Sequence, residues 1–173
     1  MSVETNVVPA LKGGSARTAG LLPPGGATSF LVCRVGSYRC GILLDDVEET
    51  MRPLPCEPLA GAIGIVSGVA VIRGDVVPVV DAGVLLGTGG SSEGRFVTIR
   101  VEGRRAAIKV DAVIGVRDVA NDSLVGLPPL LDGAGGEVVA ALGAQGSELL
   151  VVLREARLVP DSVWALLEDH QPA

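Results

Sequence analysis

Aromatic residues are scarce in this chain of 173 residues, which has two Phe, one Tyr and one Trp. Protein cores are often anchored by aromatic side chains, each of which buries a large area. Val, Leu, Ile and Ala must therefore fill the core. The β-branched residues among them, Val and Ile, favour β-strands. Hydrophobic residues make up 48% of the chain and the mean hydropathy is +0.49. The composition therefore indicates a globular, mainly β domain, despite 24 Gly and 11 Pro.

Histidine is almost absent, and cysteines are few. His170 is the single histidine, so multi-histidine metal sites and Ser-His-Asp or Cys-His active sites are hard to build. Cys33, Cys40 and Cys56 lack CxxC spacing. A disulfide between Cys33 and Cys40 is geometrically conceivable, but we interpret all three as small buried hydrophobic residues in a reducing cytosol. We expect no catalytic residue, no metal and no cofactor.

Positive charge and long apolar runs are also limited. The chain has 14 Lys and Arg against 20 Asp and Glu, a formal net charge of −6. This balance argues against nucleic acid as a partner, because such binders neutralise phosphates with clustered cations. Polar residues, Gly or Pro interrupt each apolar stretch before it reaches the roughly 18 residues needed to cross a membrane. With no secretory signal in the N-terminal sequence, we predict a cytoplasmic protein.

The chain divides by composition into a tail and a folded domain. Residues 1–27 are rich in Gly, Pro, Ser and Ala without periodicity, which predicts a flexible tail. The folded domain is expected over residues 28–170. Its C-terminal run VWALLED repeats apolar residues at helical spacing, and Asp161 or Ser162 can cap it. A short helix is therefore predicted to close the domain.

Strand alternation begins with the run FLVCRVGSYRCGILL, from residue 30. Apolar and polar residues alternate around Gly36-Ser37, which predicts two strands joined by a tight hairpin turn. Side chains in a strand point alternately to opposite faces. One face, from Leu31 onward, would then be buried, while Arg34 and Arg39 would point to solvent.

The same pattern returns 66 residues later as FVTIRVEGRRAAIKVDAV, residues 96–113. Seven of eighteen aligned positions are identical without a gap, and we interpret this as an internal duplication. The identical pairs are Phe30/Phe96, Arg34/Arg100, Val35/Val101, Arg39/Arg105, Ile42/Ile108, Asp45/Asp111 and Val47/Val113.

Each repeated hairpin is too small to be stable alone, so it must recruit further strands and close on itself. We expect residues 68–71 and 76–80 to complete the first hairpin. Residues 138–142 and 149–153 would complete the second. Two small barrels follow from this assignment.

The sharpest enzymatic alternative rests on VVPVVDAG, residues 76–83. Aspartic proteases place Asp after a hydrophobic strand, followed by Ser or Thr and Gly, and two such carboxylates share a proton. Asp81-Ala82-Gly83 matches that outline without the hydroxyl, and a second copy of the chain would supply the second Asp. The alternative, which we favour, is that Asp81 ends a strand and caps the following turn.

A lone arginine interrupts the apolar run VSGVAVIRGDVVPVVD, residues 66–81. Arg73-Gly74 lies between two alternating apolar strands, which predicts a tight turn that presents a guanidinium group. Arg73 is then a solvent-exposed turn residue, an ion-pair partner of Asp75 or Asp45, or a binding residue. Spacing alone leaves these alternatives open.

The same run, from Ser67 to Asp81, resembles the central motif of CheW-type chemotaxis coupling proteins. That motif has Gly-Val, then Leu-Arg-Gly, then a Val/Ile-rich run that leads into Pro and Val-Asp. The resemblance extends from Phe30 to about Leu167 and includes Tyr38-Arg39-Cys40-Gly41-Ile42, Val47-Glu48-Glu49, Val110-Asp111-Ala112-Val113 and Leu142-Gly143.

The resemblance implies two SH3-like, five-stranded β-barrels that pack on a shared core. It implies no catalytic activity. Such proteins are scaffolds that join the cytoplasmic tips of methyl-accepting chemotaxis receptors to the regulatory domain of a CheA-type histidine kinase. The chain would thus be a cytoplasmic adaptor of a two-component system, recruited to membrane-associated receptor arrays.

The resemblance also implies a partner-binding surface on which Arg73 is a recognition residue and Gly68 permits a close turn. The implied residues are Val47, Glu49, Gly68, Arg73, Gly74, Val113 and Val116. The alternative function, of a different class from a receptor–kinase scaffold, is a regulatory module that acts by self-association.

Overall fold

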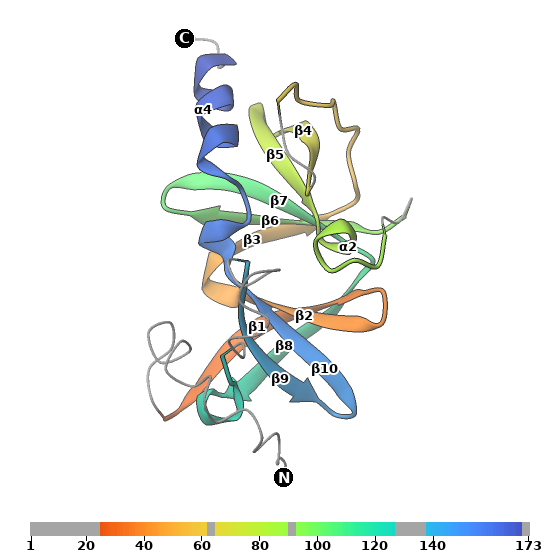
Figure 1. Ribbon diagram of the computed structural model, residues 1–173, viewed down its shortest axis with the longest axis vertical. Coiled ribbons are helices and arrows are strands. Elements are labelled where there is room, and N and C mark those ends of the chain that lie inside the picture. Colours follow the sequence, from red (N-terminus) through yellow and green to blue (C-terminus); the bar gives the residue numbers. More distant parts are fainter. Residues whose placement is uncertain (1–24, 62–64, 90–92, 127–137, 171–173) are drawn as a thin grey trace. The chain divides into compact units, whose positions relative to one another are not determined.

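A computed structural model describes residues 25–61, 65–89, 93–126 and 138–170 (Figure 1). The predicted tail falls almost wholly outside these residues and stays a prediction. The chain forms two compact units. The first takes its described residues from 1–34, 38–45 and 114–155, and the second from 35–37, 46–113 and 156–173. No helix in the described part of the chain is long and apolar enough to cross a membrane.

The first unit contains most of a five-stranded sheet in the order β8-β1-β2-β10-β9, of which Val35, Ala112 and Val113 are assigned to the second unit. Its strands are β1 (Ala27–Val35), β2 (Tyr38–Leu43), β8 (Ala112–Ala120), β9 (Val139–Gln145) and β10 (Glu148–Leu153). The central hairpin β1–β2 turns at Gly36-Ser37, as predicted. β10 runs parallel to β2, with Val151 opposite Cys40, and antiparallel to β9.

The second unit contains a five-stranded sheet in the order β3-β6-β7-β5-β4. Its strands are β3 (Val47–Met51), β4 (Val66–Ile72), β5 (Asp75–Asp81), β6 (Arg95–Val101) and β7 (Arg104–Val110). β5 runs parallel to β7, with Val80 opposite Ile108. The helical segments of the described chain are η2 (Leu44–Asp46), α2 (Ala82–Leu85), η3 (Asn121–Ser123), η5 (Glu155–Arg157) and α4 (Asp161–His170).

The two repeats exchange strands between the sheets. Hairpin β1–β2 pairs with β8 and β10 of the second repeat, and hairpin β6–β7 pairs with β3 and β5 of the first. The expectation that residues 68–71 and 76–80 complete the first hairpin, and 138–142 and 149–153 the second, is therefore wrong. Both repeats carry the same apolar alternation, so alternation cannot tell which repeat supplies the neighbours of a hairpin.

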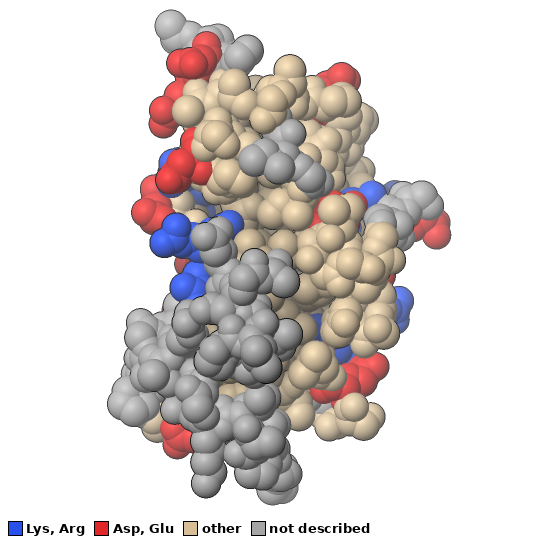
Figure 2. Space-filling view, viewed as in Figure 1, with Lys and Arg blue, Asp and Glu red and all other residues tan. Residues whose placement is uncertain are grey.

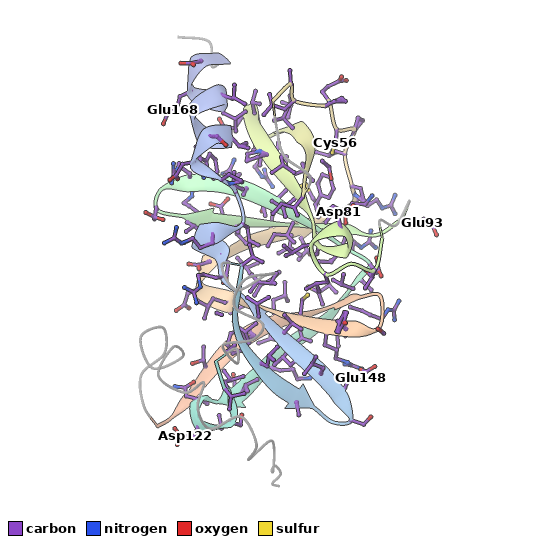
Figure 3. The ribbon with its side chains drawn as sticks, in the orientation of Figure 1. Cys56, Asp81, Glu93, Asp122, Glu148 and Glu168 are labelled. Carbon is purple, nitrogen blue, oxygen red and sulfur yellow. The ribbon has the colours of Figure 1, made fainter. Side chains whose placement is uncertain are left out.

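Two ion pairs follow the same exchange of strands between the repeats. Arg39 in β2 pairs with Glu148, the first residue of β10 and labelled in Figure 3. At the equivalent position in β7, Arg105 pairs with Asp75, the first residue of β5, at 2.9 Å. Each hairpin arginine thus bonds an acid that begins the fifth strand of the other repeat.

The expected five-stranded barrels are observed as curled sheets, each joined at one further backbone bridge. Glu57 and Val69 exchange two hydrogen bonds of 2.8 Å, which link the segment after β3 to β4. Val125 and Leu142 likewise exchange two hydrogen bonds, of 2.9 and 2.7 Å, which link the segment after β8 to β9. The segment RPLPCEP, residues 52–58, holds three prolines without an N–H group, so it cannot extend the ladder along β4.

The hairpin β1–β2 is buried more completely than its alternation predicts. Phe30, Leu31, Val32 and Cys33 are all buried, so both faces of β1 are covered. The expectation of one buried and one solvent face is wrong over this stretch, although Arg34 is exposed. Burial also raises the pKa of the Cys33 thiol to about 12, because the thiolate would lose its hydration. Cys33 and Cys40 are buried as expected, whereas Cys56 is only partly buried.

The two repeated phenylalanines occupy equivalent cores. Phe30 packs with residues of β8, the segment after it, β9 and β10, which are Val119, Leu124, Ala140, Ala141, Leu150 and Val152. Phe96 packs with residues of β4, β5 and β7, which are Ala70, Ile72, Val77, Val79 and Ala107. Each ring therefore fills the space between a hairpin and the strands of the other repeat. The packing of the two barrels on a shared core stays a prediction.

The C-terminal helix forms where the sequence predicts it. α4 begins at Asp161 and buries Val163 and Leu167. The guanidinium carbon of Arg104 in β7 lies 4.6 Å from the centroid of the Trp164 ring, which is a cation–π contact within the second unit. The chain's one tryptophan thus attaches α4 to the second sheet.

We predict that Phe30→Ala and Phe96→Ala each lower the free energy of unfolding by about 3–5 kcal/mol, because a large cavity replaces a fully buried ring. Urea denaturation followed by circular dichroism measures this change. Leu149→Ala, at a half-exposed position of β10, is the control and should cost less than about 1 kcal/mol. A small effect at only one phenylalanine would contradict the equivalence of the two cores.

Candidate functional site

Arg73 and Gly74 form the whole turn between β4 and β5. Their φ angles are 51° and 86°, both in the left-handed region, as in the two-residue turns that match strand twist. Asn, Asp and Gly are the residues this turn favours, because a larger side chain is strained there. The predicted tight turn is confirmed, and its first residue is one that the turn itself disfavours. Glu102-Gly103, between β6 and β7, has the same geometry, with φ angles of 53° and 78°.

The Arg73 side chain bonds Glu49 through both arms of its guanidinium group. Nε lies 2.7 Å from Oε2 and Nη2 lies 2.8 Å from Oε1. The bond joins the β4–β5 turn to β3, and β3 and β4 are the two outer strands of the sheet order. The sequence analysis left open an ion pair of Arg73 with Asp75 or Asp45. Glu49 is the partner instead, because the sheet curls until its outer strands approach each other.

This pair stays charged over a wide range of pH. The hydrogen bond from Arg73 lowers the pKa of the Glu49 carboxyl below its ordinary value, against a smaller opposing effect of desolvation. The same bond raises the pKa of Arg73. The Arg73 side chain is 67% exposed and that of Glu49 is 28% exposed. An incoming protein can therefore reach the guanidinium group while it is held in a fixed orientation.

A second ionic network lies on the same unit, and sequence reasoning missed it. Glu48 accepts hydrogen bonds from Nε of Arg105 and Nε of Arg100, both at 2.6 Å. Arg105 also donates to Asp75 at 2.9 Å. The bond from Arg105 is the largest cause of the lowered pKa of Glu48. The duplicated arginines were the signal that could have revealed this network, since Arg100 and Arg105 both repeat an arginine of the first hairpin.

Gly68 lies inside β4, not in the turn. A side chain there would place its Cβ 2.2 Å from the carbonyl oxygen of Glu57, and φ is 150°, so a larger residue would be both blocked and strained. The Glu57–Val69 bridge therefore requires glycine at this position. Gly68 shapes the edge of β4 from which the Arg73 turn projects.

Of the three valines singled out from the sequence, Val47 lies on the same strand as Glu49, and Val113 and Val116 lie on β8. Val47 begins β3, opposite Ile99. Val113 is the equivalent position of the second repeat, in β8, and belongs to the second unit. Val116, farther along β8, is 48% exposed and belongs to the first unit. Among the seven residues singled out from the sequence, the side chains of Glu49 and Arg73 bond each other directly, and Gly74 follows Arg73 in the turn.

An exposed apolar residue accompanies the charged pair. Val71 is 65% exposed and lies two residues before Arg73 on β4. Val76, directly opposite on β5, is partly exposed. An exposed aliphatic pair beside an oriented guanidinium group has the composition of a small protein interface, with an apolar centre and a polar rim. Sequence reasoning did not identify Val71 as a site residue.

Asp81, labelled in Figure 3, ends β5 and caps α2. Its Oδ1 accepts hydrogen bonds from the backbone N–H of Gly83 at 2.8 Å and of Val84 at 3.2 Å. This confirms the interpretation of Asp81 as a capping residue. Among the residues that the structure describes, no three His, Cys, Asp or Glu gather as metal ligands would.

On the face shown in Figure 2, charged side chains of both signs lie toward the margins, and uncharged residues occupy most of the rest. The ion pairs described above give the same picture, since each arginine in them is matched by an acid. Such a surface offers local pairing to a protein partner instead of a broad field of one sign.

We predict that the Glu49 carboxyl titrates below the ordinary glutamate range and returns toward it in Arg73→Ala. A pKa lowered by folding means that the pair stabilises the fold above the ordinary pKa and loses this contribution as pH falls through the lowered value. Carbon-detected NMR titration of the side-chain carboxyls measures both. Glu48 is the internal control, because its partners are Arg105 and Arg100. An unchanged Glu49 midpoint in Arg73→Ala would refute the pair.

Comparison with known proteins agrees with this fold. The family model described as CheW-like domain matches residues 29–163. Chemotaxis protein CheW of Treponema pallidum is 26% identical over 132 residues, which cover 69% of this chain and 75% of that relative. Chemotaxis protein CheW of Klebsiella aerogenes is 26% identical over 143 residues, which cover 81% of this chain and 86% of that relative.

A crystal structure of the scaffolding protein TtCheW from Thermoanaerobacter tengcongensis has the same fold. The TM-score is 0.64 at 20% identity, and the match covers 75% of this chain and 90% of that chain. The fold was thus expected correctly as mainly β, with two SH3-like sheets and a C-terminal helix. Because the family match spans most of the chain, including the Arg73 turn and both hairpins, the chain belongs to the CheW-like domain family.

Proposed function

We propose that this chain is a non-enzymatic scaffold of chemotaxis-like signalling, which joins chemoreceptors to a CheA-type histidine kinase. Membership of the CheW-like domain family supports this role. Two relatives carry the name chemotaxis protein CheW, and the structural neighbour is named a scaffolding protein. The chain then works in the cytoplasm, at membrane-associated receptor arrays, and needs neither cofactor nor metal.

The single observation that carries the proposed binding site is the arginine at a turn position that disfavours it. If the turn alone were selected, Asn, Asp or Gly would relieve the backbone strain. An arginine held there by two hydrogen bonds to Glu49 retains a guanidinium group at the tip of the hairpin. Backbone strain that the surroundings maintain is a pointer to function. Arg73 is therefore the residue through which a partner recognises this hairpin.

The proposed interface is small, and its parts have different tasks. Val71 provides apolar contact, while Arg73 and Glu49 provide orientation and selectivity. The described surface has few aromatic anchors, because the chain has only four aromatic residues. A single contact is then weak, and many linked copies in an array supply the avidity. Val47, Gly74, Val113 and Val116 belong to this proposal as further contact residues.

Asp81 supports the absence of catalysis in the proposal. Its carboxylate oxygen already accepts two backbone hydrogen bonds at the start of α2. A shared-proton pair of carboxylates would need that carboxylate to face a second acid. Binding without chemistry is the function that the described contacts support best.

We predict that Arg73→Asn weakens binding to the kinase regulatory domain or to the receptor tip by about tenfold or more, as removal of a central contact does. The substitution keeps the turn, because Asn accepts the left-handed conformation. Glu102→Asn is the matched control, since it relieves the same strain at the β6–β7 turn and should leave binding unchanged. Calorimetry or surface plasmon resonance with purified partners measures both affinities.

The result separates the site from the role. If both variants bind like the wild type, the role stands and the Arg73 site is wrong. If the wild type binds neither kinase nor receptor, and a pull-down from soluble and membrane fractions retains neither, the scaffold role itself is refuted. Thermal unfolding of each variant confirms that a loss of binding is not a loss of folding.

A further inference from the structure

The hairpin β1–β2 is a separate piece of the first sheet, although it lies at its centre. In the order β8-β1-β2-β10-β9, both strands that flank the hairpin come from the other repeat. Along the chain, the hairpin reaches those strands only through the whole sequence of the second sheet, residues 47–110. The hairpin thus fills a slot between β8 and β10, and no short connection ties it to that slot.

The hydrogen bonds that hold this hairpin come from one contiguous part of the chain. Its backbone and side chains bond Asp111, Asp118, Asn121, Glu148 and Glu155. Phe30 and Val32 complete a core whose other buried members also follow residue 111. The same hydrogen bonds and core packing therefore form whether residues 111–155 belong to the same copy of the chain or to another.

The connection between the hairpin and β3 is short. It consists of the three residues of η2, Leu44–Asp46. This segment joins β2 of one sheet to β3 of the other and is not a hairpin turn within either sheet. A short connection between a hairpin and the rest of the chain favours exchange between copies, because it can extend into a hinge. After exchange, the hairpin has the same neighbours as in the closed monomer.

We propose that this chain forms a strand-exchanged homodimer, in which the hairpin β1–β2 of each copy occupies the slot between β8 and β10 of the other. The single chain already builds both sheets by exchanging hairpins between its repeats, and the dimer repeats this exchange between copies. It forms during folding, when the slot is empty. It competes with the closed monomer where protein concentration approaches the effective concentration of the tethered hairpin, about 1 mM for a flexible tether.

The Arg39–Glu148 pair supplies a direct test, because it joins the hairpin to β10. Arg39→Glu and Glu148→Arg each place like charges together in the monomer. In an exchanged heterodimer of these two variants, both sheets regain opposite charges. We expect co-refolding of the two variants at high concentration to yield heterodimers above the statistical proportion. Native mass spectrometry separates the heterodimer from both homodimers by mass.

The matched control is a mixture of 15N-labelled wild type with the unlabelled double variant Arg39→Glu/Glu148→Arg, because this charge exchange leaves the chain mass unchanged and the label separates the dimers by mass. Each monomer there has a complementary pair, and an exchanged heterodimer would hold two like-charge pairs. Heterodimers should therefore fall below the statistical proportion. Statistical proportions in both mixtures would show that the copies meet through another surface, and monomers alone at every concentration would show no association. Either result overturns the proposal.

A covalent link gives a second measurement that does not depend on charge. Val151→Cys faces Cys40 across β2 and β10, so oxidation joins these two thiols. The chains also carry Cys33→Ala and Cys56→Ser, so that Cys40 has no other thiol to join. After refolding at high concentration, the exchanged form gives a covalent dimer in denaturing gels, and the monomer gives an internal link. Val79→Cys/Ala107→Cys, across β5 and β7, is the control that stays internal in both forms. Internal links alone for both variants would overturn the proposal.

Discussion

Two parallel strand pairs, β2 with β10 and β7 with β5, hold this structure together. Parallel strands cannot be joined by a tight turn, so their partners must come from distant parts of the chain. In the first sheet this requirement places the N-terminal hairpin against β10, a strand made more than a hundred residues later. The burial of Phe30 and the ion pair of Arg39 both follow from that pairing. The same arrangement in the second sheet gives Phe96 its core and Arg105 its acid.

The candidate site depends on the curl of the second sheet. β3 and β4 are the outer strands in the order of hydrogen bonding, yet Glu49 in β3 reaches the turn that follows β4. Gly68 permits the Glu57–Val69 bridge that draws the segment after β3 onto β4. The orientation of the Arg73 guanidinium group is therefore a property of the closed sheet, although only two side chains make the bond. In the proposed role, the Arg73 side chain is already oriented and needs no rearrangement before a partner binds.

The sequence predicted what is local and missed what depends on long-range pairing. The turns at Gly36 and Arg73, the cap at Asp81 and the helix α4 follow from residue types and short spacing, and all are observed. The exchange of strands could not be predicted, because the duplicated repeats have the same apolar pattern and differ only in what they meet in space. The partner of Arg73 was missed for the same reason, since Glu49 is near it only after the sheet curls. The two-sided burial of β1 likewise reflects tertiary packing that alternation does not encode.

The position of the first hairpin in the chain also determines the order in which the sheets can be completed on the ribosome. β1 and β2 are synthesised first, but β10, which runs beside β2, is nearly the last strand to be made. All five strands of the second sheet have left the ribosome before β8 does. At a translation rate of about 5–20 residues per second, the apolar first hairpin waits on the order of ten seconds for its partner. The second sheet, in the middle of the chain, can therefore fold first during synthesis. The first hairpin stays uncovered until then, and molecular chaperones can bind it.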